Sequence, residues 1–246
     1  MNIIEAILLG ILQGLTEFLP ISSSGHLAIA QQIFNIEEAD VAFDVMLHLG
    51  TLIAVLVYYR QDVLRLVSEF FLLISGWFRG QRPKLLDPDR PYRILMVMVV
   101  IATIPTAIIG LLLKDMFVSI FSRLNIVGFA LIITGILLWL SNRIFGNRKK
   151  PENMSVSDAV WVGIVQSIAM VPGISRSGST IFAGLLRGFT PELATRFSFL
   201  LSIPAILGAV VLEGKDIFSN ASTFHDILPV TGGFFAAAVS GSLAIR

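Results

Sequence analysis

One apolar stretch occurs twice in this chain, and each copy is broken by proline, glycine and serine. Residues 10–30 read GILQGLTEFLPISSSGHLAIA, and residues 163–183 read GIVQSIAMVPGISRSGSTIFA. The two copies align without a gap at an offset of 153 residues, and 8 of the 21 aligned positions are identical. Paired, interrupted apolar segments in a membrane protein are typical of a central site that is built from two repeats.

The composition supports a membrane protein. Hydrophobic residues make up 55% of the 246 residues and charged residues only 14%, with a mean hydropathy of +0.82. An average soluble domain carries about 25% charged residues. We therefore expect one integral membrane domain over residues 1–246. Since Glu5 stands where a signal peptide would be basic, we expect the N-terminus to belong to the mature fold.

The residue content argues against two kinds of interaction, binding to nucleic acid and bonds formed through cysteine. The net charge is +1 and there is no long basic run, so no nucleic-acid partner is expected. Cysteine is absent, which excludes disulfides and thiolate metal sites.

The pattern of apolar segments predicts an all-α polytopic membrane protein. Five segments are candidate spans: 41–59, 94–113, 124–141, 193–212 and 227–245. The apolar runs that follow the two breaks, 27–34 and 179–186, would each cover only about 12 Å of a hydrocarbon core of about 30 Å. Each copy is therefore predicted to form a re-entrant helix–loop–helix, in a first repeat of about 1–142 and a second of about 156–246.

The distribution of charge predicts the orientation. The connections 60–93 and 142–155 carry most of the Lys and Arg residues and are expected to be cytoplasmic, whereas the acidic connection 35–44 is expected outside. Three spans between the two re-entrant segments then make the repeats inverted, with both tips near the midplane. The segment 66–78 is too short to span and is predicted to be an interfacial helix.

The first break contains residues suited to acid–base chemistry. Gln13 and Glu17 are four residues apart and share a helix face. Because a charge is costly in an apolar setting, Glu17 should face a cavity, a cation or a partner; the alternative is that it reaches the surface from an interfacial helix. His26 directly follows the serines 22–24 and can transfer a proton or act as a nucleophile; alternatively it is a capping residue.

The second break is suited to binding an anion. Ser175, Arg176, Ser177 and Thr180 stand among glycines at the expected start of a helix, where backbone N–H groups and a planar guanidinium attract phosphate. The alternative for Arg176 is a structural ion pair. That pair could also form with Glu17 when no substrate is bound, so the two interpretations are compatible.

Together the two breaks offer a carboxylate, a histidine, hydroxyls and an arginine, which are the parts that phosphoryl transfer needs. A hard cation, Mg²⁺ or Ca²⁺, held by Glu17 and by substrate phosphates is expected. His48, His225 and Arg196 are expected to have structural or solvated roles.

The motifs QGLTEFLPISSSGHL and PGISRSGST, with FSFLLSIPA at 197–205, closely resemble those of the undecaprenyl-diphosphate phosphatase family, also called the bacitracin-resistance protein family. The resemblance implies inverted repeats and removal of the terminal phosphate of undecaprenyl diphosphate. It also implies recycling of the lipid carrier for cell-wall synthesis, a divalent cation, and an active site that opens to the outer face of the plasma (inner) membrane.

The resemblance also implies roles for single residues. Glu17 is the motif carboxylate, Ser23 and His26 are the candidate nucleophile and base in an order left open, and Arg176 binds phosphate. Three further residues fall on motif positions: Ser22, Ser175 and Thr180.

The chain departs from the family pattern at two points. Gln13 stands where a second carboxylate is possible, so it should bind a metal only weakly or through water. Family members also usually continue through one more helix, so the second repeat is expected to lack a final helix.

Two further possibilities follow from the pattern. The first is a secondary transporter or lipid flippase, since such proteins use the same inverted-repeat architecture. The second is a homodimer formed through the Gly- and Ala-rich segment 227–245, since small residues allow close helix contact.

Overall fold

The computed structural model describes residues 1–36, 41–144, 148–220 and 224–246, and within them the side chains of residues 41, 214–220 and 224–226 are not described. The side chain of His225 and the residues 37–40, three of them acidic, therefore lie outside the described part. Across the described part the chain is helical, and its only β-type pairing is an isolated bridge between Lys149 and Phe189. The helices are α1 Ile3–Phe18, α2 Ser23–Ile33, α3 Val41–Tyr58, α4 Arg60–Phe78, α5 Pro91–Leu112, α6 Lys114–Phe121, α7 Leu124–Ser141, α8 Val156–Ile168, α9 Arg176–Leu186, α10 Pro191–Asn220 and α11 Phe224–Ala244, with a short 3₁₀ turn, η1 Pro151–Asn153.

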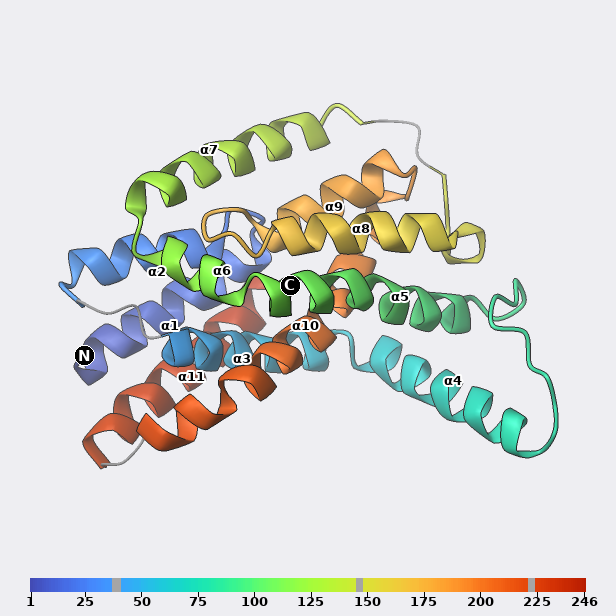
Figure 1. The fold of residues 1–246 in the computed structure, drawn as a ribbon, viewed down its shortest axis with the longest axis horizontal. Helices are drawn as coiled ribbons and strands as arrows, with labels where there is room; N and C mark the ends of the chain where they lie inside the picture. The colour runs from blue at the N-terminus through green and yellow to red at the C-terminus, as the bar shows by residue number, and fades with distance from the viewer. Residues whose placement is uncertain (37–40, 145–147, 221–223) are drawn as a thin grey trace.

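Each copy of the repeated stretch forms a broken pair of helices. The pair α1–α2 begins and ends at the left of Figure 1, whereas the pair α8–α9 begins and ends at the right. The connecting turns of both pairs lie in the middle of the molecule (Figure 1). This arrangement confirms the predicted fold class, an all-α protein in which two helix–loop–helix segments enter from opposite ends.

The same local interaction begins both pairs. The Glu5 carboxylate accepts a hydrogen bond from the backbone N–H of Asn2 at 2.8 Å, and the Asp158 carboxylate accepts one from Ser155 at 2.9 Å. Such contacts satisfy a backbone donor that the first helical turn leaves free. Glu5 and Asp158 are 153 residues apart, which is the offset of the repeat.

Identical glycines bring each pair against its neighbouring helix. A Cβ atom at Gly10 would lie 2.2 Å from the carbonyl oxygen of Gly233 in α11, and a Cβ atom at Gly163 would lie 2.3 Å from that of Ala102 in α5. Only glycine allows either approach. Helix α1 therefore packs on α11 in the way that α8 packs on α5.

The contact at Gly163 yields a stability prediction. Gly163→Ala should lower the thermal unfolding midpoint in detergent, because overpacking of this kind typically costs about 1–3 kcal/mol. Gly128→Ala is the matched control, since a Cβ atom at Gly128 in α7 meets nothing within 4 Å and alanine favours a helix. Equal midpoints for the two variants would contradict the close packing of α8 on α5.

The small residues of α11 pack against other helices of the same chain. Added Cβ atoms show the close fit: one at Gly14 of α1 would lie 2.0 Å from Ser240 Oγ, and one at Gly50 of α3 would lie 2.5 Å from the carbonyl oxygen of Phe234. This face is therefore buried against α1 and α3. The reason for expecting a dimer through 227–245 is thereby removed, and dimerisation itself stays an untested prediction.

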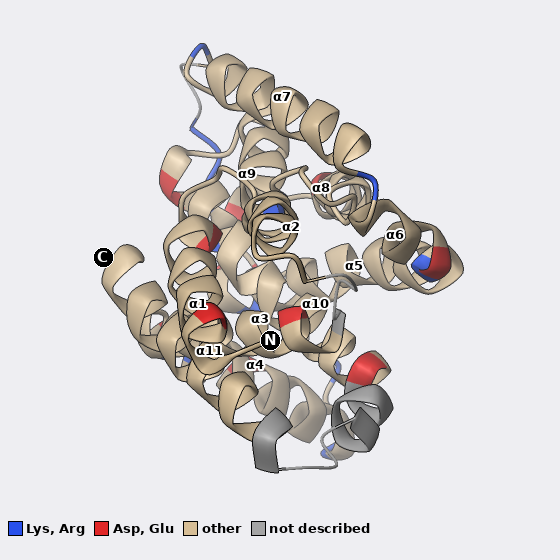
Figure 2. Cartoon of the chain, turned by 90° about the vertical axis from the view of Figure 1, so that its left-hand side faces the viewer, with Lys and Arg blue, Asp and Glu red and all other residues tan. Residues whose placement is uncertain are grey.

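Four described helices are long and apolar enough to cross a membrane, namely α5, α7, α10 and α11. Figure 2 shows α7 as a helix without Lys, Arg, Asp or Glu between its ends. Helix α3 meets this criterion only together with α4, and the two are bent by 84° at Tyr59. The helix predicted over 66–78 thus begins earlier, at Arg60, and its interfacial position stays a prediction. The short helix α6 was not predicted.

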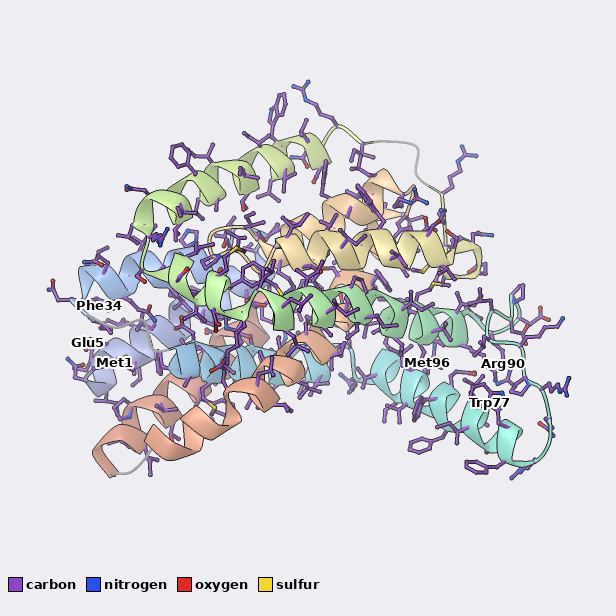
Figure 3. The ribbon with its side chains drawn as sticks, viewed as in Figure 1. Met1, Glu5, Phe34, Trp77, Arg90 and Met96 are labelled. Carbon is purple, nitrogen blue, oxygen red and sulfur yellow. The ribbon has the colours of Figure 1, made fainter. Side chains whose placement is uncertain are left out.

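The two basic connections lie at the same end of the molecule. In Figure 1 the α4–α5 connection and the start of α8 are both at the right, and Figure 3 places Trp77 and Arg90 there. The labelled Glu5 and Phe34, at the ends of the first helix pair, lie at the opposite end (Figure 3). The separation of these two ends agrees with the prediction that both basic connections lie on the same side of the membrane.

An ion-pair cluster at the basic end fastens the second helix pair. Asp158 is buried, and its two carboxylate oxygens accept from Lys149 Nζ at 2.8 Å and from Arg187 Nε at 2.7 Å. Burial alone would raise the pKa of Asp158, but the hydrogen bonds from Lys149, Ser155 and Arg187 outweigh it and lower the pKa to about 2. Arg196 also forms an ion pair, with its Nη1 3.8 Å from Asp62 Oδ1, and this pairing is compatible with the predicted structural role.

The lowered pKa of Asp158 predicts a pH-dependent stability. A carboxyl whose pKa is lower in the folded state stabilises fully above its ordinary pKa of 3.8, and this contribution is lost as the pH falls from about 4 to 2. The lowering is equivalent to ~2 kcal/mol at neutral pH. Thermal unfolding should therefore separate the wild type from Asp158→Asn at pH 7, and the gap should narrow below pH 4. A gap that does not change with pH would contradict the assignment.

Candidate active site

The first break is a tight turn. Ser22 lies in the left-handed region with φ of 72°, and its Oγ accepts a hydrogen bond from the N–H of Gly25 at 3.3 Å. Such N-capping compensates a free backbone donor, so the helix restarts at Ser23. Ser23 and His26 consequently lie in the first turn of α2.

The second break is longer and is fastened by a third helix. Gly173 has φ of 96°, and Ser175 Oγ accepts from the N–H of Gly178 at 3.0 Å, as Ser22 does in the first copy. Thr134 of α7 donates to the carbonyl of Gly173 at 2.8 Å and accepts from the N–H of Ser175 at 2.9 Å. Helix α7 therefore sets the position at which α9 and Arg176 begin.

The two turns touch one another. A Cβ atom at Gly25 would lie 2.9 Å from the Cα of Gly173, and one at Gly178 would lie 3.0 Å from the carbonyl oxygen of Pro20. Ser177 Oγ donates across the gap to the carbonyl of Glu17 at 3.4 Å. The identical pair Gly25 and Gly178 thus lies where the two copies cross, and the predicted meeting of the tips is confirmed.

The Glu17 carboxylate is the centre of the cluster. Its side chain is only 6% exposed, and Oε2 accepts from Ser23 Oγ at 2.6 Å and from Gln13 Nε2 at 3.0 Å. The other oxygen, Oε1, accepts from Nη2 of Arg176 in the opposite turn. A buried carboxylate needs such partners. Four of the predicted residues, Gln13, Glu17, Ser23 and Arg176, thus form one hydrogen-bonded group.

His26 is three residues after Ser23, in the same first turn of α2. Its Nδ1 is 2.7 Å from the carbonyl oxygen of Ser22. A carbonyl can only accept, so we assign the proton to Nδ1, which leaves a lone pair on Nε2. The ring is therefore arranged as a base or a nucleophile.

The remaining predicted residues have structural hydrogen bonds. Ser22 and Ser175 cap their helices. Thr180 Oγ1 lies 2.6 Å from Ser198 Oγ of α10 and donates to the carbonyl of Arg176 at 2.9 Å. Thr180 therefore joins α9 to α10, and contact of these hydroxyls with phosphate stays a prediction.

His48 was expected to be structural; it lies beside the Glu17 carboxylate, and its role stays a prediction. Its Nε2 lies 3.7 Å from Glu17 Oε2, so α3 contributes a side chain to the site. The signal available in the sequence was the cost of an ionisable side chain inside an apolar segment. Thr134, which fastens the second turn, carried no comparable signal.

Two buried polar atoms in the site have no protein partner. Within the described residues of the site, they are Gln13 Oε1, whose residue is fully buried, and Arg176 Nη1. Buried polar atoms are normally hydrogen-bonded, so each indicates a place for a water or a ligand. The donor Nη1 suits an anion, and the amide oxygen suits a cation.

The donor set fits a divalent cation in part. Glu17 and Gln13 offer the oxygen ligands that Mg²⁺ and Ca²⁺ prefer. Within the described residues no group of three His, Cys, Asp or Glu side chains could hold a metal. Oxygens from a bound phosphate would therefore have to complete the coordination shell.

The chain is similar to known proteins over nearly its whole length. Residues 6–246 match the family described as bacitracin resistance protein BacA. The chain belongs to this family. Relatives in the family include the undecaprenyl-diphosphatase of Alkaliphilus metalliredigens, 45% identical over 247 residues covering all of this chain and 89% of that protein. The undecaprenyl-diphosphatase of Methanobrevibacter smithii is also 45% identical, and undecaprenyl-diphosphatase 4 of Bacillus thuringiensis is 40% identical; this chain spans 88% and 86% of their lengths.

Proposed function

We propose that this protein hydrolyses undecaprenyl diphosphate to the monophosphate and inorganic phosphate. The observation that carries the proposal is the contact of Arg176 with Glu17 across the two turns, with a second buried guanidinium nitrogen left free for phosphate. The names of the relatives support the same activity. The product would return the lipid carrier to cell-wall synthesis, which would account for bacitracin resistance.

The geometry supports a two-step reaction. In the first step Ser23 Oγ attacks the terminal phosphorus, its proton passes to Glu17 Oε2 at 2.6 Å, and the bond to the bridging oxygen breaks. In the second step water attacks the phosphoserine and gives a proton to His26 Nε2, the serine oxygen leaves and recovers its proton from Glu17, and inorganic phosphate and the His26 proton are released to solvent. His26 Nε2 as the nucleophile is the alternative, since it also carries a free lone pair.

Arg176 would hold the terminal phosphate during both steps. Its planar fork can donate to Glu17 through Nη2 and to a phosphate oxygen through Nη1. The N-terminal end of α9, which begins at Arg176, carries the partial positive charge of the helix dipole, and this charge favours an anion. A divalent cation held by Glu17 and Gln13, Mg²⁺ or Ca²⁺, would neutralise phosphate charge when it is bound.

We place the protein in the plasma (inner) membrane with its site open to the outer face. The support is the clustering of the two basic connections at one end of the molecule, which should be cytoplasmic. The lipid tail would then lie along the exposed apolar helices in the bilayer.

Phosphate release in detergent tests the activity. The purified chain with undecaprenyl diphosphate should release phosphate, excess EDTA should lower the rate by at least about 100-fold, and Mg²⁺ or Ca²⁺ should restore it. A rate that chelator leaves unchanged would contradict the cation requirement. The transporter alternative is tested in liposomes, where lipid movement without any phosphate release would overturn the phosphatase proposal.

A further inference from the structure

Helix α3 brings a histidine to the site from outside both motifs. His48 Nδ1 lies 2.7 Å from the carbonyl oxygen of Asp44, one turn earlier in the same helix. Since a carbonyl only accepts, Nδ1 carries a proton and Nε2 is the nitrogen that faces Glu17 Oε2, at 3.7 Å. Metal-binding histidines are commonly oriented in this way, with the second ring nitrogen donating to a backbone carbonyl.

The two faces of the Glu17 carboxylate have different surroundings. Arg176 occupies Oε1, on the side that we assign to phosphate. Gln13, Ser23 and His48 all approach Oε2. On the neutral ring the Nε2 lone pair would face Glu17 Oε2 and could bind a cation between them, whereas on the charged ring Nε2–H would pair directly with Glu17.

The distance and the neighbouring amide suit a cation at this point. Two ligands bonded to one divalent ion at about 2.1 Å each lie about 3–4 Å apart, and the separation of Nε2 from Oε2 falls in that range. The buried amide of Gln13 has its oxygen without a protein partner, and rotation of that amide would direct the oxygen to the same place. Within the described residues no group of three His, Cys, Asp or Glu side chains could hold a metal; the third donor at this point would be an amide oxygen.

We propose that His48 is a nitrogen ligand of the divalent cation, beside the carboxylate of Glu17 and the amide oxygen of Gln13. The proposal rests on the cation-dependent phosphatase function proposed above and specifies its metal site. An imidazole ligand raises affinity for transition ions over hard alkaline-earth ions. The protein should therefore bind Mn²⁺ or Co²⁺ more tightly than an all-oxygen site would.

Electron paramagnetic resonance with Mn²⁺ tests this without reference to turnover. Tag-free full-length protein in detergent, titrated with Mn²⁺ alone, should show a ¹⁴N coupling to bound manganese in pulsed spectra. His48→Gln should lose that coupling and weaken Mn²⁺ binding by about tenfold or more. Because glutamine can still offer an oxygen, Mg²⁺ affinity measured by competition should change less.

His26→Gln is the matched control. His26 also has Nδ1 on a backbone carbonyl, that of Ser22, whereas the histidine contact with Glu17 that the structure describes is made by His48. This variant should keep the ¹⁴N coupling. Loss of the coupling in His26→Gln with retention in His48→Gln would overturn the proposal. So would bound Mn²⁺ without ¹⁴N coupling in the wild type, the result expected if His48 were only a charged partner of Glu17.

The outcome is separable from that of the phosphatase proposal. Phosphate release by the wild type is measured in parallel, and the metal-free thermal midpoint of His48→Gln shows whether the variant is folded. Release that requires a cation, without nitrogen coupling, would overturn the role of His48 alone. Nitrogen-coupled Mn²⁺ without any release would support the ligand assignment and overturn the activity.

Discussion

Replacing Glu17 by glutamine is expected to lower phosphate release from undecaprenyl diphosphate by about 10³-fold. Glutamine keeps the size of the side chain but cannot take the Ser23 proton at 2.6 Å, and it removes the negative charge that Arg176 and a cation share. The rate at saturating substrate, kcat, should fall by a larger factor than the apparent affinity for the substrate. Initial rates over a range of substrate and Mg²⁺ concentrations provide the measurement.

Glu5→Gln is the control for this variant. Glu5 lies on the same helix at the far end of the molecule (Figure 3), and glutamine can also accept from the backbone at this capping position. Its activity should equal that of the wild type. If Glu17→Gln retained more than about a tenth of wild-type activity, Glu17 would be neither base nor cation ligand.

Arg176→Lys should reduce kcat/KM by about 10²–10³-fold. Lysine keeps the positive charge near Glu17 but lacks the planar fork with which Arg176 would hold Glu17 and phosphate together. Arg176→Ala should in addition lower the unfolding midpoint, because it leaves a buried carboxylate without its cationic partner. Steady-state rates and thermal unfolding of both variants separate the two effects.

Arg187→Lys is the matched substitution, since Arg187 directly follows the same helix and pairs with Asp158 rather than with Glu17. It should preserve activity. Wild-type kcat/KM in Arg176→Lys would show that charge alone is required, and the role of the planar fork would be wrong.

The repeated stretch carried most of the prediction of the fold. Its two breaks were found from Pro, Gly and Ser within apolar segments, and the span 124–141 has the bounds that α7 has in the structure. The meeting of the two tips also followed, because an odd number of intervening spans inverts the second copy. These conclusions were accessible because they depend on local hydrophobicity and on counting.

Other features depend on contacts between distant segments. The small residues of α11 are equally compatible with a dimer and with packing inside the chain, and the structure shows that packing, with Gly10 against the carbonyl of Gly233 and Gly14 against Ser240. Thr134 resembled any other threonine of an apolar span until its hydroxyl was found on the Gly173–Ser175 turn.

The sequence by itself determined the class of protein, the two broken helix pairs and the residue types available for phosphoryl transfer, because hydropathy and backbone-breaking residues act locally. Only the tertiary structure decided which side chains share the Glu17 carboxylate: Arg176 on one oxygen, Ser23 and Gln13 on the other, and His48 beside them. The physical reason is that this arrangement depends on how α1, α3 and α9 cross, and the close approaches at glycines that set those crossings join residues far apart in the chain.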